Sequence, residues 1–283
     1  MRVRVSYGSA IGLGLLDRRA DVIPKTVYLM VKGDCIGGCR FCAQAGGEDE
    51  RLSRVTWPEF ELEEVAGRIT NQERVCIQCL NYDGVFEDLL KILGTLPDIP
   101  ISVSAPPFAR EKLEELEKRV ERIGISIDAA TEEIFGRIKP GYSWEKVWTA
   151  LQDAIDVFGA DRVSTHLIAG LGETEEEMIA VLGKVVKMGA TPSLFAFTPL
   201  KGTGLEGAAR PPLDYYRRLQ VARARIVHGI GEDEAKNNPD TYTVNGCPGC
   251  DRPYYNEGPA GPFYNYPRKP NKGEMTRIVQ ELK

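Results

Sequence analysis

The feature that most constrains the fold is an alternation of short apolar runs with longer amphipathic stretches, which extends from Val27 to His228. Near-continuous apolar runs of this length are typical of strands that are buried on both faces of a parallel sheet. The runs that we predict as strands are Val27–Val31, Arg74–Gln78, Ile101–Ser104, Ile123–Asp128, Val163–Ala169 and Ser193–Thr198. Six β/α units are too few for a closed eight-stranded barrel, so we predict an α/β fold that forms a partial (β/α)6 TIM-like barrel.

The segments between these runs carry helix-start signals, such as Ser or Thr followed by acidic residues, or a proline near the first turn. They predict helices that start after Thr56, over Phe108–Arg122, after Thr131, over Ser143–Phe158, from Thr174 to Met188 and over Leu213–His228. In such folds the chemistry lies at the C-terminal ends of the strands. Residues that directly follow a predicted strand are therefore the first candidates for a functional site.

Two segments lie outside the repeat. Residues 1–26 form an N-terminal extension to the barrel of residues 27–228, and residues 229–283 form a C-terminal tail. The tail is rich in Pro, Gly, Asn and Tyr, which predicts irregular structure. Disorder is the alternative, but a Cys-x-x-Cys pair and several aromatic residues favour a tail that is anchored on the barrel.

The charge balance and hydropathy argue against nucleic acid and membranes as partners. The chain has 36 Lys and Arg against 41 Asp and Glu, a net charge of −5, whereas nucleic-acid binding needs a basic face. The longest uncharged apolar stretch, Ser9–Leu16, is far shorter than the ~20 residues that span a bilayer. It also contains two glycines and lacks the cleavage site of a signal peptide, so we expect a cytoplasmic protein.

The cysteines form one group of three and two Cys-x-x-Cys pairs. They are Cys35, Cys39 and Cys42 after the first predicted strand, Cys76 and Cys79 at the end of the second, and Cys247 and Cys250 in the tail. An odd number of cysteines in a large intracellular-type chain favours metal binding or catalysis over a disulfide framework. Because the chain has only two histidines, any metal chemistry depends on thiolate ligands, which favour iron–sulfur clusters or zinc.

The group of three has the spacing Cys-x3-Cys-x2-Cys. Three thiolates this close together can hold three corners of a [4Fe–4S] cluster and leave the fourth iron without a protein ligand. Gly37 and Gly38 allow the intervening loop to fold tightly. A structural zinc site is the alternative, but zinc normally requires four ligands and no fourth is near in sequence.

This spacing after a first strand, with Phe41 before the last cysteine, resembles the radical S-adenosylmethionine (SAM) superfamily. The resemblance extends over roughly residues 25–210. It implies that SAM binds the open iron through its amino and carboxylate groups and is cleaved to a 5′-deoxyadenosyl radical, which removes a hydrogen atom from an unactivated carbon. It implies no catalytic residue beyond the cluster ligands, because the cofactor carries the difficult step.

The resemblance also implies SAM contacts at the ends of the later strands. Asp128 is expected to accept a hydrogen bond from a ribose hydroxyl, with a helix N-cap as its alternative role. Ile168 and Gly170 belong to a pattern that contacts adenine, in which His166 replaces the family's first glycine; a structural histidine is favoured over a base. Phe197 starts a loop that resembles biotin-synthase-like members.

Two serines on the third predicted strand complete the expected SAM contacts. Ser102 and Ser104 alternate along that strand, so they share one face. The resemblance implies that they reach the methionine end of SAM. Packing within the sheet is the equally weighted alternative.

The two Cys-x-x-Cys pairs together give a four-ligand signal. Cys76 and Cys79 can converge only if the chain turns at the strand end, whereas Cys247 and Cys250 already flank a Pro-Gly turn. We expect both pairs to bind one auxiliary [4Fe–4S] cluster after the tail folds back over the barrel mouth. A structural zinc site and a redox dithiol are the alternatives.

An auxiliary cluster in a biotin-synthase-like chain suggests sulfur insertion, and the tail resembles that of the two-component lipoyl synthases found mainly in archaea. Single-chain lipoyl synthases carry an N-terminal cysteine triad and an Arg-Ser-Ser motif, which this sequence lacks. The resemblance implies an octanoyl chain on a carrier protein as substrate (a lipoyl domain or a glycine-cleavage-type carrier), a related partner subunit and an electron donor such as ferredoxin. Arg252, Tyr254 and Tyr255 are expected either to line the substrate channel or to pack under the tail.

Two other functional classes remain open at this point. One is biotin synthase or another enzyme that thiolates a C–H carbon of a small molecule. The other is a non-catalytic iron–sulfur protein for electron transfer or scaffolding. An iron without a protein ligand argues against the second class, because electron carriers close their clusters.

Overall fold

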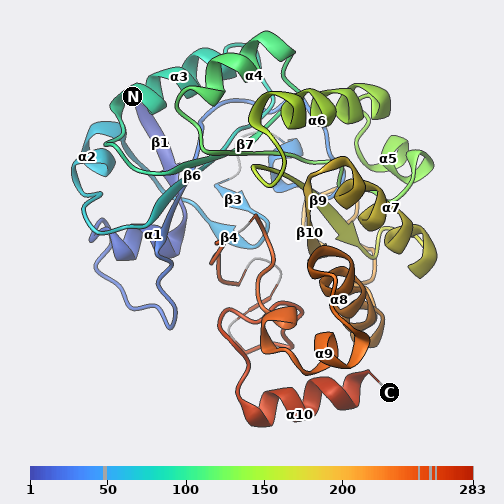
Figure 1. Cartoon of the computed structure of the whole chain (residues 1–283). Helices are drawn as coiled ribbons and strands as arrows, with labels where there is room; N and C mark the ends of the chain where they lie inside the picture. Colours follow the sequence, from blue (N-terminus) through green and yellow to red (C-terminus); the bar gives the residue numbers. More distant parts are fainter. Residues whose placement is uncertain (47–49, 248, 255–256, 259, 283) are drawn as a thin grey trace.

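The computed structural model describes residues 1–46, 50–247, 249–254, 257–258 and 260–282. Within these residues, six parallel strands follow one another in chain order, and helices cover their outer side as an arc (Figure 1). The parallel strands are β2 (Thr26–Met30), β6 (Arg74–Gln78), β7 (Ile101–Ala105), β8 (Arg122–Ile125), β9 (Val163–Ala169) and β10 (Thr191–Ala196). The prediction of a partial (β/α)6 barrel is confirmed.

Two N-terminal elements extend this sheet beyond β2. Strand β1 (Arg2–Val5) pairs antiparallel with β2, and β5 (Glu59–Glu61) pairs antiparallel with β1. Arg2 and Arg4 face Glu59, with nitrogen–oxygen distances of 3.2 and 3.5 Å. The extension is therefore part of the same sheet.

The helix predicted to start after Thr56 is wrong. Residues Val55–Thr56 (β4) form a two-stranded hairpin with Arg51–Leu52 (β3), β5 follows, and helix α2 begins only at Leu62 and ends at Gly67. Cross-strand pairs of opposite charge stabilise a strand. A local helix signal would assign the residues of β5 to a first helical turn. Because β5 pairs with β1, they form a strand instead.

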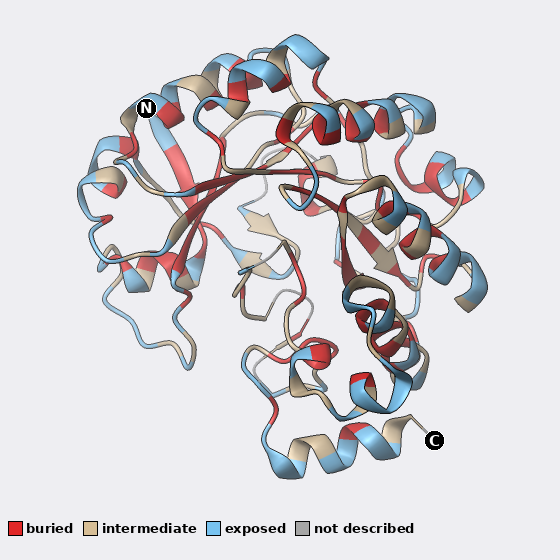
Figure 2. Cartoon of the chain, viewed as in Figure 1, coloured by how far each residue is buried: buried red, intermediate tan, exposed pale blue. Residues whose placement is uncertain are grey.

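The remaining helices follow the predicted signals closely. They are α3 (Val85–Thr95), which was not predicted, α4 (Arg110–Glu117), α5 (Glu132–Ile138), α6 (Trp144–Phe158), α7 (Glu175–Met188) and α8 (Leu213–His228), with the short α1 (Tyr7–Gly12) in the extension. Thr131 and Ser143 are N-caps, and Thr174 forms a capping box with Glu177. Figure 2 shows that the strands are buried while the helices expose their outer sides, so the core lies between the two layers.

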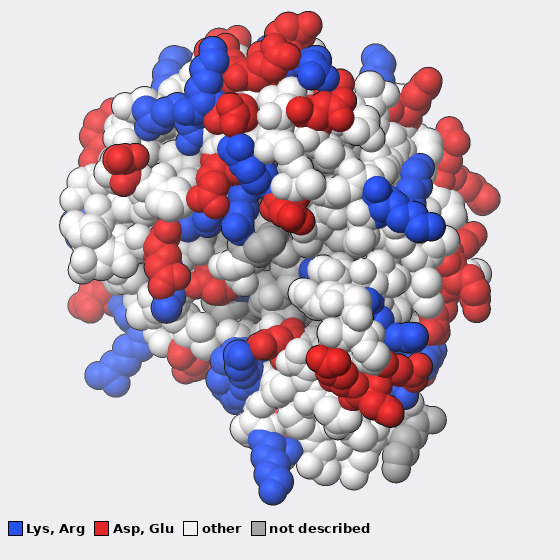
Figure 3. Space-filling view, viewed as in Figure 1, with Lys and Arg blue, Asp and Glu red and all other residues white. Residues whose placement is uncertain are grey.

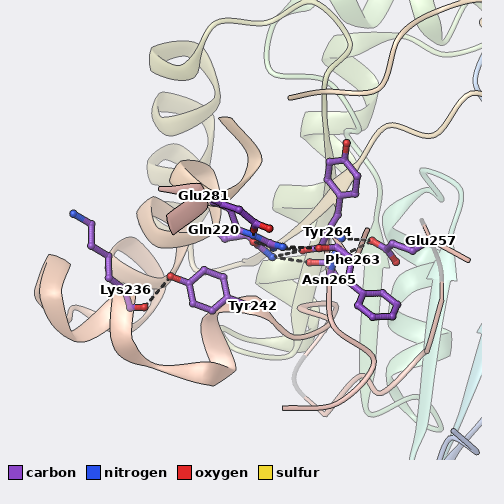
Figure 4. A network of polar contacts seen from close by, with 9 residues as sticks. Gln220, Lys236, Tyr242, Glu257, Phe263, Tyr264, Asn265 and Glu281 are labelled. Atoms are coloured by element: carbon purple, nitrogen blue, oxygen red, sulfur yellow. Dashed lines mark hydrogen bonds and ion pairs between the residues drawn. The ribbon is translucent and has the colours of Figure 1, made fainter. Parts of the chain in front are cut away.

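The C-terminal tail contains more regular structure than we predicted. It includes α9 (Glu232–Asn237), a 3-10 turn η2 (Pro239–Tyr242) and α10 (Lys272–Glu281). A polar network ties the tail to α8 and to itself (Figure 4): Gln220 Nε2 donates to the carbonyl of Tyr264 at 2.9 Å, and Glu257 Oε1 accepts from the backbone N–H groups of Tyr264 and Asn265. Backbone groups of this irregular segment are thus satisfied, which is what an ordered tail requires.

The tail also connects the first and last parallel strands. The backbone N–H of Leu194 on β10 donates to Asn245 Oδ1 at 2.9 Å. The hydroxyl of Tyr28 on β2 donates to Asp251 Oδ1 at 2.9 Å and accepts from the Asp251 N–H at 3.1 Å. The tail therefore occupies the open side of the barrel, where Figure 1 places it beneath β4 and β10.

The surface agrees with the small net charge. On the face in Figure 3, Lys and Arg side chains are interspersed with Asp and Glu. No helix in the part of the chain that the structure describes is long and apolar enough to cross a bilayer.

Candidate active site

Three cysteines of the predicted cluster loop line one cavity at the carboxyl ends of the strands. Cys35, Cys39 and Cys42 face one hollow, whose wall also includes Cys79 and Ser104. These side chains come from the loop after β2 and from the ends of β6 and β7. The parallel register of these strands brings their carboxyl ends to one rim.

Glycines hold the cysteine loop tightly against the connection between α5 and α6. A Cβ atom on Gly37 would lie 2.7 Å from Tyr142, and one on Gly141 would lie 2.6 Å from the carbonyl oxygen of Gly37. The Arg40 N–H also donates to the Ile138 carbonyl at 2.8 Å. This close approach requires residues without side chains, so a larger residue at either glycine would push the loop away from this connection.

The chemistry of these donors fits the iron–sulfur cluster that the loop spacing predicts. Burial raises the pKa of the Cys39 thiol to about 12, so cluster binding must displace a proton from it. Within the described residues, no three Cys, His, Asp or Glu side chains converge on a point where a single ion could sit. A [4Fe–4S] cluster binds each thiolate through a different iron, so thiols spread around a cavity suit it.

Four of the predicted SAM contacts line a second cavity next to the first. Phe41, Asp128, Ile168 and Phe197 surround it, and Cys42 lies in the wall that the two cavities share. Phe41 and Asp128 also face both cavities. The structure therefore places an apolar pocket with one buried carboxylate directly beside the cysteine loop.

Gly170, the fifth predicted contact of this group, shapes the adjoining loop. Its φ is +97°, and an added Cβ atom would lie 2.7 Å from Pro211. Glu173 Oε1 accepts from the Gly170 N–H at 2.6 Å and from the Tyr215 hydroxyl at 2.8 Å. The glycine and glutamate of this pattern thus fix the turn that follows Ile168.

The N-cap alternative for Asp128 is wrong. Helix α5 is capped by Thr131, whose Oγ1 accepts from the Ile134 N–H at 3.3 Å. Asp128 instead has a positive φ of +65° and forms a buried ion pair with Lys139, with 2.8 Å between Oδ2 and Nζ. Strained non-glycine residues of this kind concentrate at functional sites.

The two predicted serines differ in their surroundings. Ser104 lines the cysteine cavity. Ser102 is buried and accepts a hydrogen bond from Arg74 Nη1 at 3.1 Å, while Arg74 also holds Glu121 at 2.9 Å. Ser102 faces neither of the two cavities described above, because it lies two residues nearer the start of the strand. Packing is the role that these contacts support for Ser102.

A third cavity brings together three of the four remaining cysteines. Cys76, Cys247 and Cys250 line it, together with Tyr28 and Arg252. The fourth, Cys79, lines the cavity of the first cysteine loop instead. The chain stays extended through the end of β6, where the Cys79 N–H donates to the Ser104 carbonyl, so the side chains of Cys76 and Cys79 do not turn toward each other.

The thiols of this third cavity differ in acidity. A hydrogen bond from Cys247 lowers the pKa of Cys250, although burial opposes this effect. Burial raises the pKa of Cys76 to about 12. Cys250 is therefore the most acidic thiol of this cavity, and Cys76 must lose a proton when it binds a metal.

His166 lies where the three cavities meet and lines all of them. Its Nδ1 lies 3.0 Å from Ser126 Oγ, and its ring packs edge-on against Phe195 at 5.1 Å between centroids. Burial lowers the pKa of His166, so the imidazole is neutral near pH 7. The side chain acts as a wall between the pocket of Asp128 and the thiols of the tail.

The aromatic residues of the tail are separated in the structure. Arg252 lies over the rings of Trp57 and Tyr28, at 4.9 and 5.8 Å from their centroids. Tyr254 lines a different surface groove with Arg19 and Arg54. Tyr255 lies outside the described residues. Of the two expected channel residues that the structure describes, Arg252 lies at a cysteine cavity and Tyr254 does not.

Two residues of the site were not predicted. Tyr28 lies in a strand that is buried along its whole length, and its polar hydroxyl inside an apolar run is the available sequence signal. Lys139 ends a helix just before Pro140 and Gly141, a position normally exposed to solvent, so nothing local indicates its burial.

Comparison with known proteins agrees with this geometry. The family model of the radical SAM superfamily matches residues 31–185, more than half of the chain, and the chain belongs to this superfamily. It is therefore an enzyme of a family whose members bind SAM at a [4Fe–4S] cluster. A comparison with curated proteins finds no match.

Solved structures with the same fold include three radical SAM proteins. The FeFe-hydrogenase maturase HydG from Carboxydothermus hydrogenoformans has 19% identity and a TM-score of 0.58, over 72% of this chain and 51% of its own. Methylornithine synthase (PylB) has 17% identity and a TM-score of 0.55, over 69% and 59%. A radical SAM methyltransferase from Sphaerobacter thermophilus has 14% identity and a TM-score of 0.52, over 74% and 65%. The chain spans less than two thirds of each neighbour's length, and at these identities the likeness concerns the fold.

Proposed function

We propose that this chain is a sulfur-inserting radical SAM enzyme, a lipoyl synthase subunit that thiolates a C–H carbon of an octanoyl chain on a carrier protein. The observation that carries the proposal is the third cavity, where Cys76, Cys247 and Cys250 gather next to the Asp128 pocket. A second set of thiols beside this pocket supports a second cluster that can supply sulfur to a substrate held there.

The cysteine loop and the adjoining pocket would hold the first cluster and SAM. When bound, they supply the one-electron chemistry that removes a hydrogen atom from an unactivated carbon. Cys35, Cys39 and Cys42 are the cluster ligands in this proposal. Asp128 binds a ribose hydroxyl, and the apolar side chains of Phe41, Ile168 and Phe197 exclude water from the reacting atoms.

Cys76, Cys247 and Cys250 would hold an auxiliary [4Fe–4S] cluster that donates sulfur. Cys79, which the sequence predicted as the fourth ligand, lines the cavity of the first cysteine loop instead. Arg252 at the wall of this cavity favours anionic thiolates there, because it is a cation. His166 separates this cavity from the Asp128 pocket, so a substrate carbon beside the imidazole would face both.

One part of the wall of the third cavity is apolar and supports an apolar substrate. Val103, Ile123, Phe195 and Val244 form this part, whereas Gln78, Ser104, Arg122 and Ser164 contribute polar groups elsewhere in the wall. Contact with apolar side chains stabilises a bound hydrocarbon chain, whereas a polar ring in the same place would lose hydrogen bonds to water. This favours the octanoyl chain over the small polar substrates of biotin-synthase-like enzymes. A related partner subunit and an electron donor such as ferredoxin complete the proposed system.

The test is an anaerobic assay of the iron-reconstituted chain with an octanoyl-lysyl peptide, SAM and a reductant, with and without the partner subunit. We expect about eight irons per chain, formation of 5′-deoxyadenosine and sulfur in the peptide by mass analysis. Thiolation of a small molecule in place of the peptide would instead assign a biotin-synthase-like enzyme. Absence of SAM cleavage by the reduced protein would leave an electron-transfer or scaffold role.

A further inference from the structure

We infer that Lys139 is a positioning residue that orients Asp128 toward SAM and joins the SAM pocket to the cysteine loop. The inference rests on the proposed role of Asp128 and goes beyond it, because Lys139 is itself neither a proposed SAM contact nor a proposed cluster ligand. It assigns one buried cation to two neighbouring sites.

The first observation is the way that Lys139 closes the turn after β8. Its Nζ donates to the carbonyl of Ser126 at 2.6 Å and to Asp128 Oδ2 at 2.8 Å. Lys139 is 4% exposed and Asp128 is 7% exposed, so the pair is shielded from water. A lysine this deep needs its partners, because an unpaired buried charge is strongly unfavourable.

The second observation is the conformation that the pair maintains. Asp128 has a left-handed backbone, while its N–H donates to the His166 carbonyl at 2.7 Å and its own carbonyl accepts from Ile168 at 3.0 Å. Lys139 occupies Oδ2, and within the described residues no hydrogen bond reaches Oδ1. The second carboxylate oxygen is thus available to a hydroxyl group in the pocket of Phe41 and Phe197.

The third observation is the contact between the Lys139 segment and the cysteine loop. The Tyr142 N–H donates to the Lys139 carbonyl at 3.0 Å, and the Lys139 Nζ lies 4.6 Å from the centroid of the Tyr142 ring, which packs on Gly37. Lys139 lines the same cavity as the three loop thiols.

Two consequences follow from a shared cation. Loss of Lys139 should free the Asp128 side chain and weaken SAM binding. It should also remove a positive charge beside the iron–sulfur ligands, which makes addition of an electron harder and moves the midpoint potential of the cluster to more negative values. A residue that only supports folding would change neither quantity in the folded protein.

The experiment compares Lys139→Met, Lys139→Arg, Asp128→Asn and the double variant Lys139→Met/Asp128→Asn, each reconstituted anaerobically. SAM dissociation constants, EPR-monitored midpoint potentials and thermal unfolding are measured for each. Lys146→Met, an exposed lysine on α6, is the matched control. We expect Lys139→Met to weaken SAM binding at least tenfold and to lower the potential, with Lys146→Met unchanged in both.

The remaining variants separate the possible outcomes. Lys139→Arg should restore most of the potential, since it keeps the charge, but not the full SAM affinity, since a guanidinium cannot reproduce both short contacts. The SAM dissociation constant of the double variant should be at most about twofold higher than that of Lys139→Met, because both changes disrupt the same contact. Unchanged SAM affinity and potential in folded Lys139→Met, or unchanged SAM affinity in folded Lys139→Arg, would overturn the inference. The thiolation assay on the wild-type protein tests the proposed function separately, because neither SAM affinity nor potential depends on its outcome.

Discussion

The Tyr28 hydroxyl and the Asp251 carboxylate lie 2.9 Å apart, although 223 positions separate the two residues in the chain. Tyr28 comes from the first parallel strand, and Asp251 follows directly on the second cysteine of the tail. The same hydroxyl lies 3.4 Å from Cys250 Sγ. This contact sets the position of the tail thiols relative to Cys76, which lies opposite Tyr28 in the sheet register.

Removing this hydroxyl should loosen the tail. In Tyr28→Phe the Asp251 N–H loses its acceptor in a partly buried setting, which costs about 1 kcal/mol. We expect a lower denaturant midpoint and faster hydrogen exchange in the peptide that contains residues 244–252. Tyr7→Phe, at an exposed tyrosine, is the control. Equal stability of the two variants would show that the contact does not hold the tail.

The two sets of cysteines should have separable functions. Cys39→Ala should remove about four irons and all 5′-deoxyadenosine formation, because it breaks the SAM-binding cluster. Cys247→Ala and Cys76→Ala should also lose about four irons but still produce 5′-deoxyadenosine, without thiolated product. Iron analysis and mass spectrometry of the same samples check both expectations. Two outcomes contradict a sulfur-donating cluster. One is thiolation at the wild-type level in Cys247→Ala, and the other is zinc in place of iron at this site of the wild-type protein.

Thr131 and Asp128 should respond differently to alanine, because one caps a helix and the other faces a pocket. Thr131→Ala should lower the free energy of unfolding by about 1 kcal/mol and leave SAM affinity unchanged. Asp128→Ala should weaken SAM binding tenfold or more, since a charge-assisted hydrogen bond contributes roughly 1.5–3 kcal/mol. Calorimetric titration with SAM measures the difference. Equal SAM affinity in both variants would remove Asp128 from the binding site.

The docking of α10 should depend on pH. The hydrogen bond from Arg268 lowers the pKa of Glu274 below its ordinary value of 4.5, and the Asn271 N–H donates to the same carboxylate. A carboxyl whose pKa is lower in the folded state stabilises that state above its unfolded pKa, and the contribution is lost as the pH falls through the folded pKa. Amide protection in residues 272–281 should therefore decrease below about pH 4.5.

The matching variant makes this test specific. Glu274→Gln should already have reduced protection at pH 7 and a weaker pH dependence, because a neutral amide forms a weaker contact with Arg268. Glu234→Gln, at an exposed position of α9, should behave as wild type. A Glu274→Gln protein with the wild-type pH profile would assign the effect to other carboxyl groups.

Local patterns in the sequence predicted much of this structure. Apolar runs gave five of the six parallel strands to within about two residues, and Thr174, Thr131 and Ser143 marked helix starts because capping is a local interaction. The shared cavity of Phe41, Asp128, Ile168 and Phe197 follows from parallel strands whose ends meet at one rim. These features depend on neighbours in sequence or on the topology alone.

The features that were missed depend on distant partners. Glu59–Glu61 became a strand because Arg2 and Arg4 pair with it, and the strand predicted up to Asp128 ends at Ile125, after which Asp128 rejoins β9 by a single bridge. The Ser102 hydroxyl accepts a hydrogen bond from Arg74 and does not face the cavity of the cysteine loop. No spacing in the sequence reveals such contacts, because they are set by which side chain fills which space in the folded barrel.

The bridge from β2 to the tail has a consequence for the order in which the molecule matures. The loop of Cys35, Cys39 and Cys42 can acquire its surroundings once residues up to His166 have left the ribosome. The cavity of Cys76 and Cys250 is not closed until residues past 250 emerge, more than eighty positions later. During synthesis, Cys76 therefore remains open to solvent and oxidants on the inner face of an incomplete barrel, and closure of the tail ends that exposure.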